Sequence, residues 1–243
     1  MQLITTSQAT VMKRPVNPLQ VSRFLRLYED AAAQKGIKLT IGFDFHKYIS
    51  LARATPTKEP TTLNFQPDHS PIRLGDGFWM MGADKNNNVA ALQAVRLYKL
   101  SHCNFAEELE KEFGAYLDLD AYPHDSCTCT SPSAKKMIGK VAYHGDLWVR
   151  KDYRGQGMPT VMAGLAFGVA FAMWSPDFVC ALVARELLDK GVVAQYGYVH
   201  DELGGLKLVR QNVLNEYLLV WLTGEELRSS VDCDHRTKLF SVT

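Results

Sequence analysis

The sequence predicts a mixed α/β fold, with a hairpin half followed by a β-α-β half. Residues 76–100 carry apolar segments on both sides of the polar turn DKNNN, a pattern typical of a β-hairpin. Residues 157–174 carry no charge and lie between two strand-like segments, 137–149 and 177–184. Of the 243 residues, 47% are hydrophobic and 22% charged, which is typical of a globular domain with a sizeable core.

Each element follows from a local pattern. Residues 18–35 have apolar positions at helical spacing and stop at Gly36, and 44–54 predict a shorter helix. Four prolines make 55–71 a loop. After the hairpin we expect a helix at 104–117, a polar loop at 118–136, a strand at 137–149 with an interruption at His144-Gly145, a buried helix at 157–174, a central strand at 177–184, a weak helix at 185–197, a strand beginning at 215 and an irregular tail at 225–243.

The bulk properties limit the function. We expect one domain over 1–243, with a core at about 18–223 and an insertion at about 101–138. Net charge is +1, so no basic excess favours nucleic acid, and the uncharged segment is too short and glycine-rich to favour a membrane span. The first residues do not resemble a signal peptide, and the cysteines number five. We therefore expect a cytoplasmic protein with reduced thiols.

The stretch VRKDYRGQGMP (149–159) is the most informative part of the chain. It connects a predicted strand to a predicted helix through Gly155 and Gly157, which leaves the first N–H groups of the helix free to bind an anion. Arg154 adds positive charge, Pro159 fits an early helical position and Thr160 offers a hydroxyl. Neither the P-loop spacing nor G-x-G-x-x-G is present. The stretch therefore predicts a phosphate site of another kind.

These residues resemble the fingerprint of the GNAT family of acetyl-coenzyme A-dependent N-acetyltransferases, [RQ]-x-x-G-x-[GA] preceded by V-x-P-x-Y. Val149, Tyr153, Arg154, Gly155 and Gly157 stand at the family spacing. Lys151 replaces the usual proline, and Pro159 replaces the last Gly or Ala, which removes one N–H donor beside the pyrophosphate. The hairpin, the strand at 177–184 and Gly197-Tyr198 extend the resemblance over about 18–223.

The resemblance implies a GNAT-like acyl-CoA N-acyltransferase fold with splayed central strands and acetyl-CoA (coenzyme A) as co-substrate. The backbone of Leu147, Trp148 and Val149 would hold the pantetheine, while Arg154, Gly155, Gln156, Gly157, Met158 and Thr160 would bind the pyrophosphate. The implied reaction is direct attack of a small-molecule or peptide amine on the thioester, with an N–H at the strand bulge polarising the carbonyl. A homodimer is left open.

Three residues are candidates for proton transfer. The family's usual acid, a tyrosine four residues before a Gly-Phe pair, falls on Val193, and Tyr196 and Tyr198 are out of register with it. We take Tyr196 as the candidate acid, against the alternative that it packs at a helix end. His144 and Asp146 lie at i and i+2 of one strand, so a regular strand places both on one face as a candidate base. His200 is a weaker candidate.

The sequence is compatible with a few other sites and functions. His124, Cys127 and Cys129 carry zinc-type ligands, but the C-x-C spacing offers no second pair to close a tetrahedron, so no metal site is expected. A chain that retains the coenzyme A cradle without turnover, as a sensor or interaction module, is the main alternative to an enzyme. An unrelated α/β enzyme that binds another phosphate is the third reading.

Overall fold

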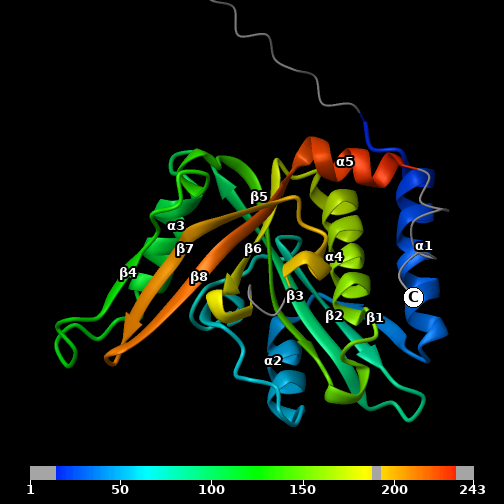
Figure 1. Cartoon of the computed structure of the whole chain (residues 1–243), viewed down its shortest axis with the longest axis horizontal. Helices are drawn as coiled ribbons and strands as arrows, with labels where there is room; N and C mark the ends of the chain where they lie inside the picture. Colours follow the sequence, from blue (N-terminus) through cyan, green and yellow to red (C-terminus); the bar gives the residue numbers. More distant parts are fainter. Residues whose placement is uncertain (1–14, 188–192, 234–243) are drawn as a thin grey trace, which may run out of the picture.

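The computed structural model describes residues 15–187 and 193–233. One sheet runs through them in the order β1-β2-β3-β5-β6-β8-β7-β4. Its two halves meet at β5 and β6 and diverge from there, as Figure 1 shows. The strands are β1 (Lys38–Gly42), β2 (Gly77–Ala83), β3 (Val89–Leu100), β4 (Ser126–Thr128), β5 (Gly139–Val149), β6 (Phe178–Ala184), β7 (His200–Arg210) and β8 (Val213–Thr223).

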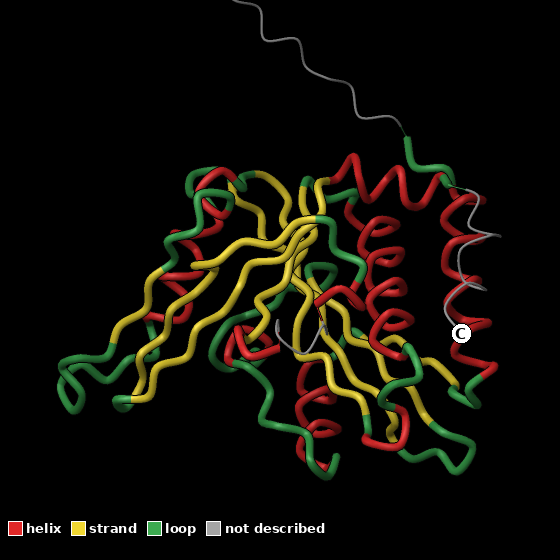
Figure 2. The backbone as a smooth tube through the Cα atoms, viewed as in Figure 1, coloured by secondary structure: helices red, strands yellow, loops and turns green. Residues whose placement is uncertain are grey.

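Helices cover both faces of this sheet. The first face carries α1 (Pro18–Gln34), α4 (Met158–Trp174) and α5 (Gly224–Asp232), whose apolar residues share one core. The second face carries α2 (Phe45–Ala54) and α3 (Phe105–Gly114), with Tyr48, Phe105 and Leu109 in a separate core. The tube in Figure 2 shows the sheet between these two sets of helices. The expectation of a mixed α/β fold is confirmed.

Helix α4 is buried along nearly its whole length, which explains its lack of charge. Its glycines let α1 approach closely. A Cβ on Gly164 would lie 2.3 Å from the Tyr28 ring, and one on Gly168 would lie 2.6 Å from Leu25. The uncharged segment is therefore a core helix. Over the described ranges, none of the helices has the length and apolarity required to cross a bilayer.

The central strands β5 and β6 are parallel but pair over a short distance. Their register covers Val141 with Phe178, Ala142 with Val179 and Tyr143 with Cys180. Beyond Tyr143, β5 continues for six residues and β6 for four, and these ends are not paired with each other. We call this region, between residues 144–149 and 181–184, the strand gap. It is the splay that the sequence resemblance implies.

A β-bulge lies in β5 beside the strand gap. Ala94 of β3 pairs with Gly145 and Leu92 pairs with Trp148, so Asp146 and Leu147 together oppose Gln93. Asp146 has φ +57°, in the left-handed region that a non-glycine residue seldom adopts. The bulge changes which face each following side chain occupies. Asp146 contacts α2, whereas Leu147 packs against the α1–α4 core.

Several elements differ from the sequence expectations. The loop at 118–136 contains the short strand β4, and the region after Tyr198 forms β7, which was not expected. The tail begins with helix α5 instead of irregular chain, and β1 was not expected. The weak helix at 185–197 is described as two 3-10 turns, Arg185–Leu187 and Val193–Tyr196, and its middle lies outside the described residues.

Candidate active site at the strand gap

The glycine turn before α4 presents a row of free backbone donors. Gly155 and Gly157 have φ of +73° and +72°, and a Cβ on either would meet nothing within 4 Å. In the part of the chain that the structure describes, five N–H groups at this turn donate to no other group: those of Gly155, Gln156, Gly157, Met158 and Thr160. Such N–H groups and the positive end of the helix dipole attract an anion. The residues present therefore fit a pyrophosphate.

The charges in this turn fix its shape. Arg150 donates to Asp84 at 2.7 Å and to Asp152 at 2.8 and 2.9 Å, and it lies over the Tyr153 ring. Asp84 belongs to the turn between β2 and β3, where its other oxygen caps the N–H groups of Asn86 and Asn88. The hydrogen bonds from Arg150 hold the pKa of both carboxyls below the ordinary value. The network thus joins the glycine turn to the central hairpin.

Two residues predicted to contact the pyrophosphate have other partners. Arg154 Nε donates to the carbonyl of Val149 at 2.9 Å, which leaves the two terminal nitrogens of this exposed side chain for solvent or a ligand. The Thr160 hydroxyl donates to the carbonyl of Gln195 at 2.7 Å, so its hydrogen is not available to an anion. Pro159 occupies the second position of α4 and supplies no donor there.

The backbone of β5 faces the strand gap at alternate residues. Arg150 N–H donates to the Ala90 carbonyl, so the antiparallel alternation turns the Trp148 amide toward β3 and the Val149 amide toward the gap. Leu147 belongs to the bulge and is free of the regular ladder. Of the three residues expected to hold the pantetheine, Val149 turns its amide toward the gap, Leu147 belongs to the bulge and Trp148 turns its amide toward β3. The Trp148 indole instead donates to the carbonyl of Thr57 at 3.2 Å.

A chain of hydrogen bonds leads from the core to Tyr198. Gln93 Nε2 donates to the Met162 carbonyl at 2.7 Å, so Gln93 Oε1 faces His144 Nε2 at 3.0 Å as an acceptor. His144 Nε2 must then carry the hydrogen, and Nδ1 is left to accept from the Tyr198 hydroxyl at 3.1 Å. The tautomer of His144 and the direction of the Tyr198 hydroxyl are both determined by one main-chain carbonyl.

Burial sets the protonation of this chain. His144 is 3% exposed and packs edge-on against the Phe167 ring. Burial lowers its pKa to about 4, so the imidazole is neutral near pH 7. Burial also raises the pKa of Tyr198 well above its ordinary value, so that its hydroxyl keeps its proton. The pair therefore presents a neutral donor, Tyr198, backed by a neutral acceptor.

The expectation that His144 and Asp146 share one face is wrong, because the bulge between them changes the alternation of the strand. His144 lies on the α4 face. Asp146 lies on the α2 face, where its Oδ2 accepts from the Tyr48 hydroxyl at 2.6 Å and from Lys58 Nζ at 2.9 Å. The two residues therefore lie on opposite sides of the sheet beside the strand gap and cannot act as one base.

Tyr198, and not the predicted Tyr196, contacts His144. Tyr196 is half-buried and packs against apolar residues of the two cores around α4 and β6. Tyr198 contacts both His144 of β5 and Phe167 of α4. His200, the weaker candidate, stacks on Trp221 and is hydrogen-bonded to Glu226 of α5. Gln93 and Lys58 had no signal in the sequence, since the register of β3 against β5 places Gln93 and the path of the loop after α2 places Lys58.

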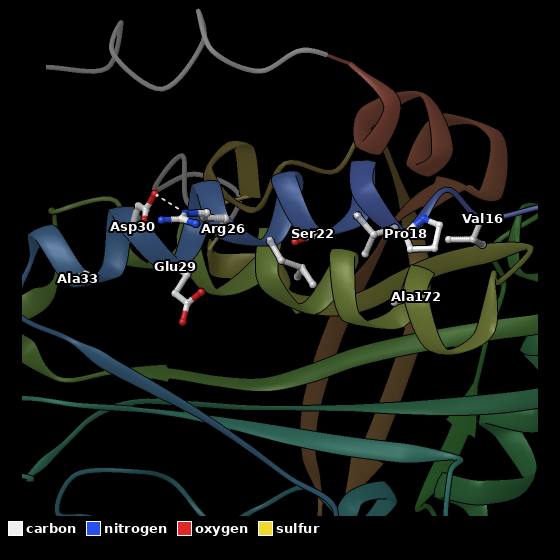
Figure 3. Close-up of a pocket in the computed structure, with 10 residues that line it drawn as sticks. Val16, Pro18, Ser22, Arg26, Glu29, Asp30, Ala33 and Ala172 are labelled. Atoms are coloured by element: carbon white, nitrogen blue, oxygen red, sulfur yellow. Dashed lines mark ion pairs between the residues drawn. The ribbon is translucent and has the colours of Figure 1, made fainter.

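Two other features lie away from the strand gap. Within the described residues, no three histidines, cysteines or acidic residues are placed to share a metal ion, and burial raises the pKa of Cys127 to about 11. A cavity of about 910 Å³ opens between α1 and α4 (Figure 3). Its wall includes Val16, Leu25, Arg26, Glu29 and Ala172, and contains no residue of β5 or β6. This cavity therefore lies outside the candidate site.

Comparisons with known proteins give matches in structure alone. No protein-family model and no curated protein sequence matches the chain. Similar solved structures include Arabidopsis thaliana NAA60 in complex with acetyl-CoA, at 11% identity and TM-score 0.43, with 76% of this chain and 98% of that chain covered. They include the spermidine/spermine N-acetyltransferase SpeG from Vibrio cholerae, at 10% identity and TM-score 0.44, with 80% and 98% covered. The ribosomal-protein-S5-alanine acetyltransferase of Vibrio fischeri matches at 11% identity and TM-score 0.42, with 78% and 94% covered.

Identities of this size concern the fold and leave the reaction of this chain open. The fold itself rests on features of the chain: the strand order, the parallel central pair that separates after three residues, the bulge in β5 and the glycine turn before α4. These are the features that the motif at 149–159 leads us to expect. In its fold the chain is similar to these three solved structures.

Proposed function

We propose that the protein transfers an acetyl or other acyl group from coenzyme A to the nitrogen of a small-molecule or peptide amine. The observation that carries the proposal is the strand gap itself. At one end of the gap lie five free N–H groups, and beside it lies the Tyr198 hydroxyl, held by His144. An anion site, an open strand edge and a proton donor are the three parts that transfer from a long phosphorylated thioester requires.

Different residues of this chain would bind the coenzyme A and transfer the protons. The N–H groups of residues 155–158 and 160 would bind the pyrophosphate, and the free edge of β5 at Leu147 and Val149 would hold the pantetheine arm in an extended form. The acceptor nitrogen forms its bond to the thioester carbonyl carbon as the carbon–sulfur bond breaks. Tyr198 gives its proton to the departing thiolate, and the proton that the nitrogen loses restores the hydroxyl.

The role of His144 in this scheme is to position the donor. Its Nδ1 accepts from Tyr198 in the ground state, which keeps the hydroxyl at the strand gap and prevents it from turning into the core. Because the imidazole is neutral and buried, it repels neither the thioester nor an incoming ammonium ion. Gln93 in turn keeps the histidine in the tautomer that accepts.

Coenzyme A binding, measured by titration calorimetry, tests the first half of the proposal. Gly157→Trp places a large side chain at the mouth of the cradle, and we expect it to weaken binding by at least about tenfold, which is about 1.4 kcal/mol. Gly75→Trp is the matched control. Gly75 also has positive φ and open surroundings, and it contacts the opposite end of α4, where its carbonyl accepts from Trp174.

Two outcomes count against the proposal, and they exclude different functions. If millimolar coenzyme A does not bind the wild-type protein, both the enzyme and the sensor are excluded. If coenzyme A binds and no amine in a broad panel causes thiol release, the protein is a binding module. Pro159 is the observation that favours the module, because it removes one donor from the cradle.

A further inference from the structure

A lysine ammonium is buried against the bulge of β5. Lys58 Nζ lies 2.9 Å from Asp146 Oδ2, and the two side chains are 2% and 5% exposed. The Tyr48 hydroxyl donates to the same oxygen at 2.6 Å, and the Glu59 carbonyl accepts from the ammonium at 3.1 Å. Carboxylate, phenol and carbonyl thus surround one primary ammonium ion.

Stability alone does not account for this arrangement. Removing two charges from water costs several kcal/mol for each ion, and their attraction seldom exceeds that cost. The backbone adds to the cost, because Thr57 and Asp146 are both non-glycine residues with positive φ, +63° and +57°. Each left-handed residue costs about 1–2 kcal/mol. Strain and a buried ion pair at one point are typical of a functional site.

The position of this ammonium matches what the proposed transfer needs. Asp146 belongs to the bulge at the edge of the strand gap, on the α2 face, whereas Tyr198 and His144 lie on the α4 face. An amine held by Asp146 and a proton donor at Tyr198 therefore approach the gap from opposite faces. This is the geometry for attack on a carbonyl carbon from one side while the sulfur is protonated from the other.

We propose that the Asp146–Tyr48 pair is the subsite for the ammonium group of the acceptor, and that Lys58 occupies it as an internal competitor. The inference rests on the proposed function and deepens it, because it names the acceptors as unbranched primary alkylamines, the class to which a lysine side chain belongs. An acceptor displaces Lys58, gives one ammonium proton to the Asp146 carboxylate, which later releases it to solvent, and attacks as the neutral amine. The C–N bond forms, the C–S bond breaks, Tyr198 protonates the sulfur, and the second nitrogen proton restores Tyr198.

The loop that carries Lys58 is short and largely exposed. Pro56 and Pro60 flank the lysine, and Thr57 is attached to the sheet through its carbonyl and the Trp148 indole. Lys58 itself extends from an otherwise exposed segment, 56–60.

The first experiment is independent of coenzyme A. Lys58→Ala keeps the Cβ and removes the other three carbons and the nitrogen, so n-propylammonium is the missing fragment. We expect n-propylammonium to bind Lys58→Ala in calorimetry and to raise its melting temperature, while n-propanol, the neutral isostere, does neither. Wild-type protein and Lys58→Arg, which keep a cation in place, should bind the fragment at least about tenfold more weakly. Lys47→Ala removes an exposed lysine of α2 and serves as the control.

The second experiment measures acylation of n-propylamine from acetyl-CoA. If Lys58 leaves the subsite in a tenth of molecules or fewer, its removal lowers KM for n-propylamine by about tenfold or more. Lys58→Gln, which keeps a donor for Asp146, should fall between wild type and Lys58→Ala, and it serves as the test if Lys58→Ala does not fold. Lys47→Ala should match wild type.

Four results overturn the inference. The first is a folded Lys58→Ala that does not bind n-propylammonium. The second is that the protein acylates other amines while KM for n-propylamine is the same in wild type and in all Lys58 variants. This result leaves the proposed function intact. The third is an acetyl group on Lys58 of the wild-type protein, found by peptide mass spectrometry, since the lysine would then be the acceptor itself. The fourth is failure of coenzyme A to bind, in which case the proposed function fails and the acceptor role falls with it, even if the ammonium fragment binds.

Discussion

Replacement of His144 by glutamine should make the protein less sensitive to acid. The wild-type imidazole has its pKa lowered by burial to about 4, against 6.5 for an unburied histidine. The two values differ by about 2.5, and each pKa unit corresponds to about 1.4 kcal/mol, so the group is coupled to folding by about 3 kcal/mol. Glutamine does not titrate and still offers a donor and an acceptor for the Gln93 and Tyr198 partners.

The direction of this pH effect on stability depends on whether the folded or the unfolded state binds the proton more readily. Below about pH 6.5 the unfolded chain takes up a proton on His144, whereas the folded protein does so only near pH 4. Protons therefore favour the unfolded state in that window. The stability present above about pH 6.5 is lost as the pH falls toward about 4, and His144→Gln should not show this part of the loss.

Denaturant unfolding at several pH values between about 7 and about 4.5 measures the effect. Between about pH 7 and about pH 4.5, the free energy of unfolding of wild type should fall by about 2–3 kcal/mol relative to that of His144→Gln. His102→Gln, at an exposed histidine, is the matched control and should follow wild type. Parallel pH profiles for wild type and His144→Gln would refute the reasoning, because they would mean that the folded imidazole titrates normally.

Three further outcomes are expected. Gly164→Ala should destabilise the protein by about 1–3 kcal/mol in denaturant unfolding, because its Cβ meets the Tyr28 ring at 2.3 Å, whereas Gly114→Ala, with open space, should be neutral or slightly stabilising. Thr223→Ala should cost about 1 kcal/mol, measured in the same way, since it removes the capping box with Glu226, and an unchanged midpoint would contradict the assigned cap. Tyr198→Phe should slow amine acylation by about 100-fold, whereas Tyr196→Phe should leave the rate near wild type, because of these two tyrosines only Tyr198 contacts His144. Equal rates for the two variants would remove Tyr198 from the mechanism.

The β-α-β unit around α4 could be predicted because its signals are local. The uncharged helix, the glycine turn before it and the apolar strand after it each follow from neighbouring residues, and all three lie where they were expected. Strand β7 was missed because Gly204-Gly205 and the charged residues of its first half interrupt the alternation. Its pairing with β8 skips residues between Glu202 and Leu206. Helix α5 had a readable signal, the capping box of Thr223 and Glu226.

The candidate site was less predictable, since it depends on one inserted residue in a strand. The i, i+2 spacing of His144 and Asp146 indicates a shared face, and the bulge reverses that conclusion. The register of β3 against β5 selects Gln93 as the partner of His144, and the path of the loop after α2 selects Lys58 as the partner of Asp146. Both contacts join residues far apart in the sequence, and neither follows from a local pattern.

Amine-dependent thiol release from acetyl-CoA tests the central claim, acyl transfer at the strand gap, most directly. A panel of primary alkylamines should cause release by the wild-type protein, with the acetyl group recovered on the amine by mass spectrometry. Gly157→Trp should abolish release, Tyr198→Phe should slow it by about 100-fold, and Gly75→Trp should leave it unchanged. Release that is absent from the wild type at saturating coenzyme A, or that is equal in all four proteins, would contradict the account.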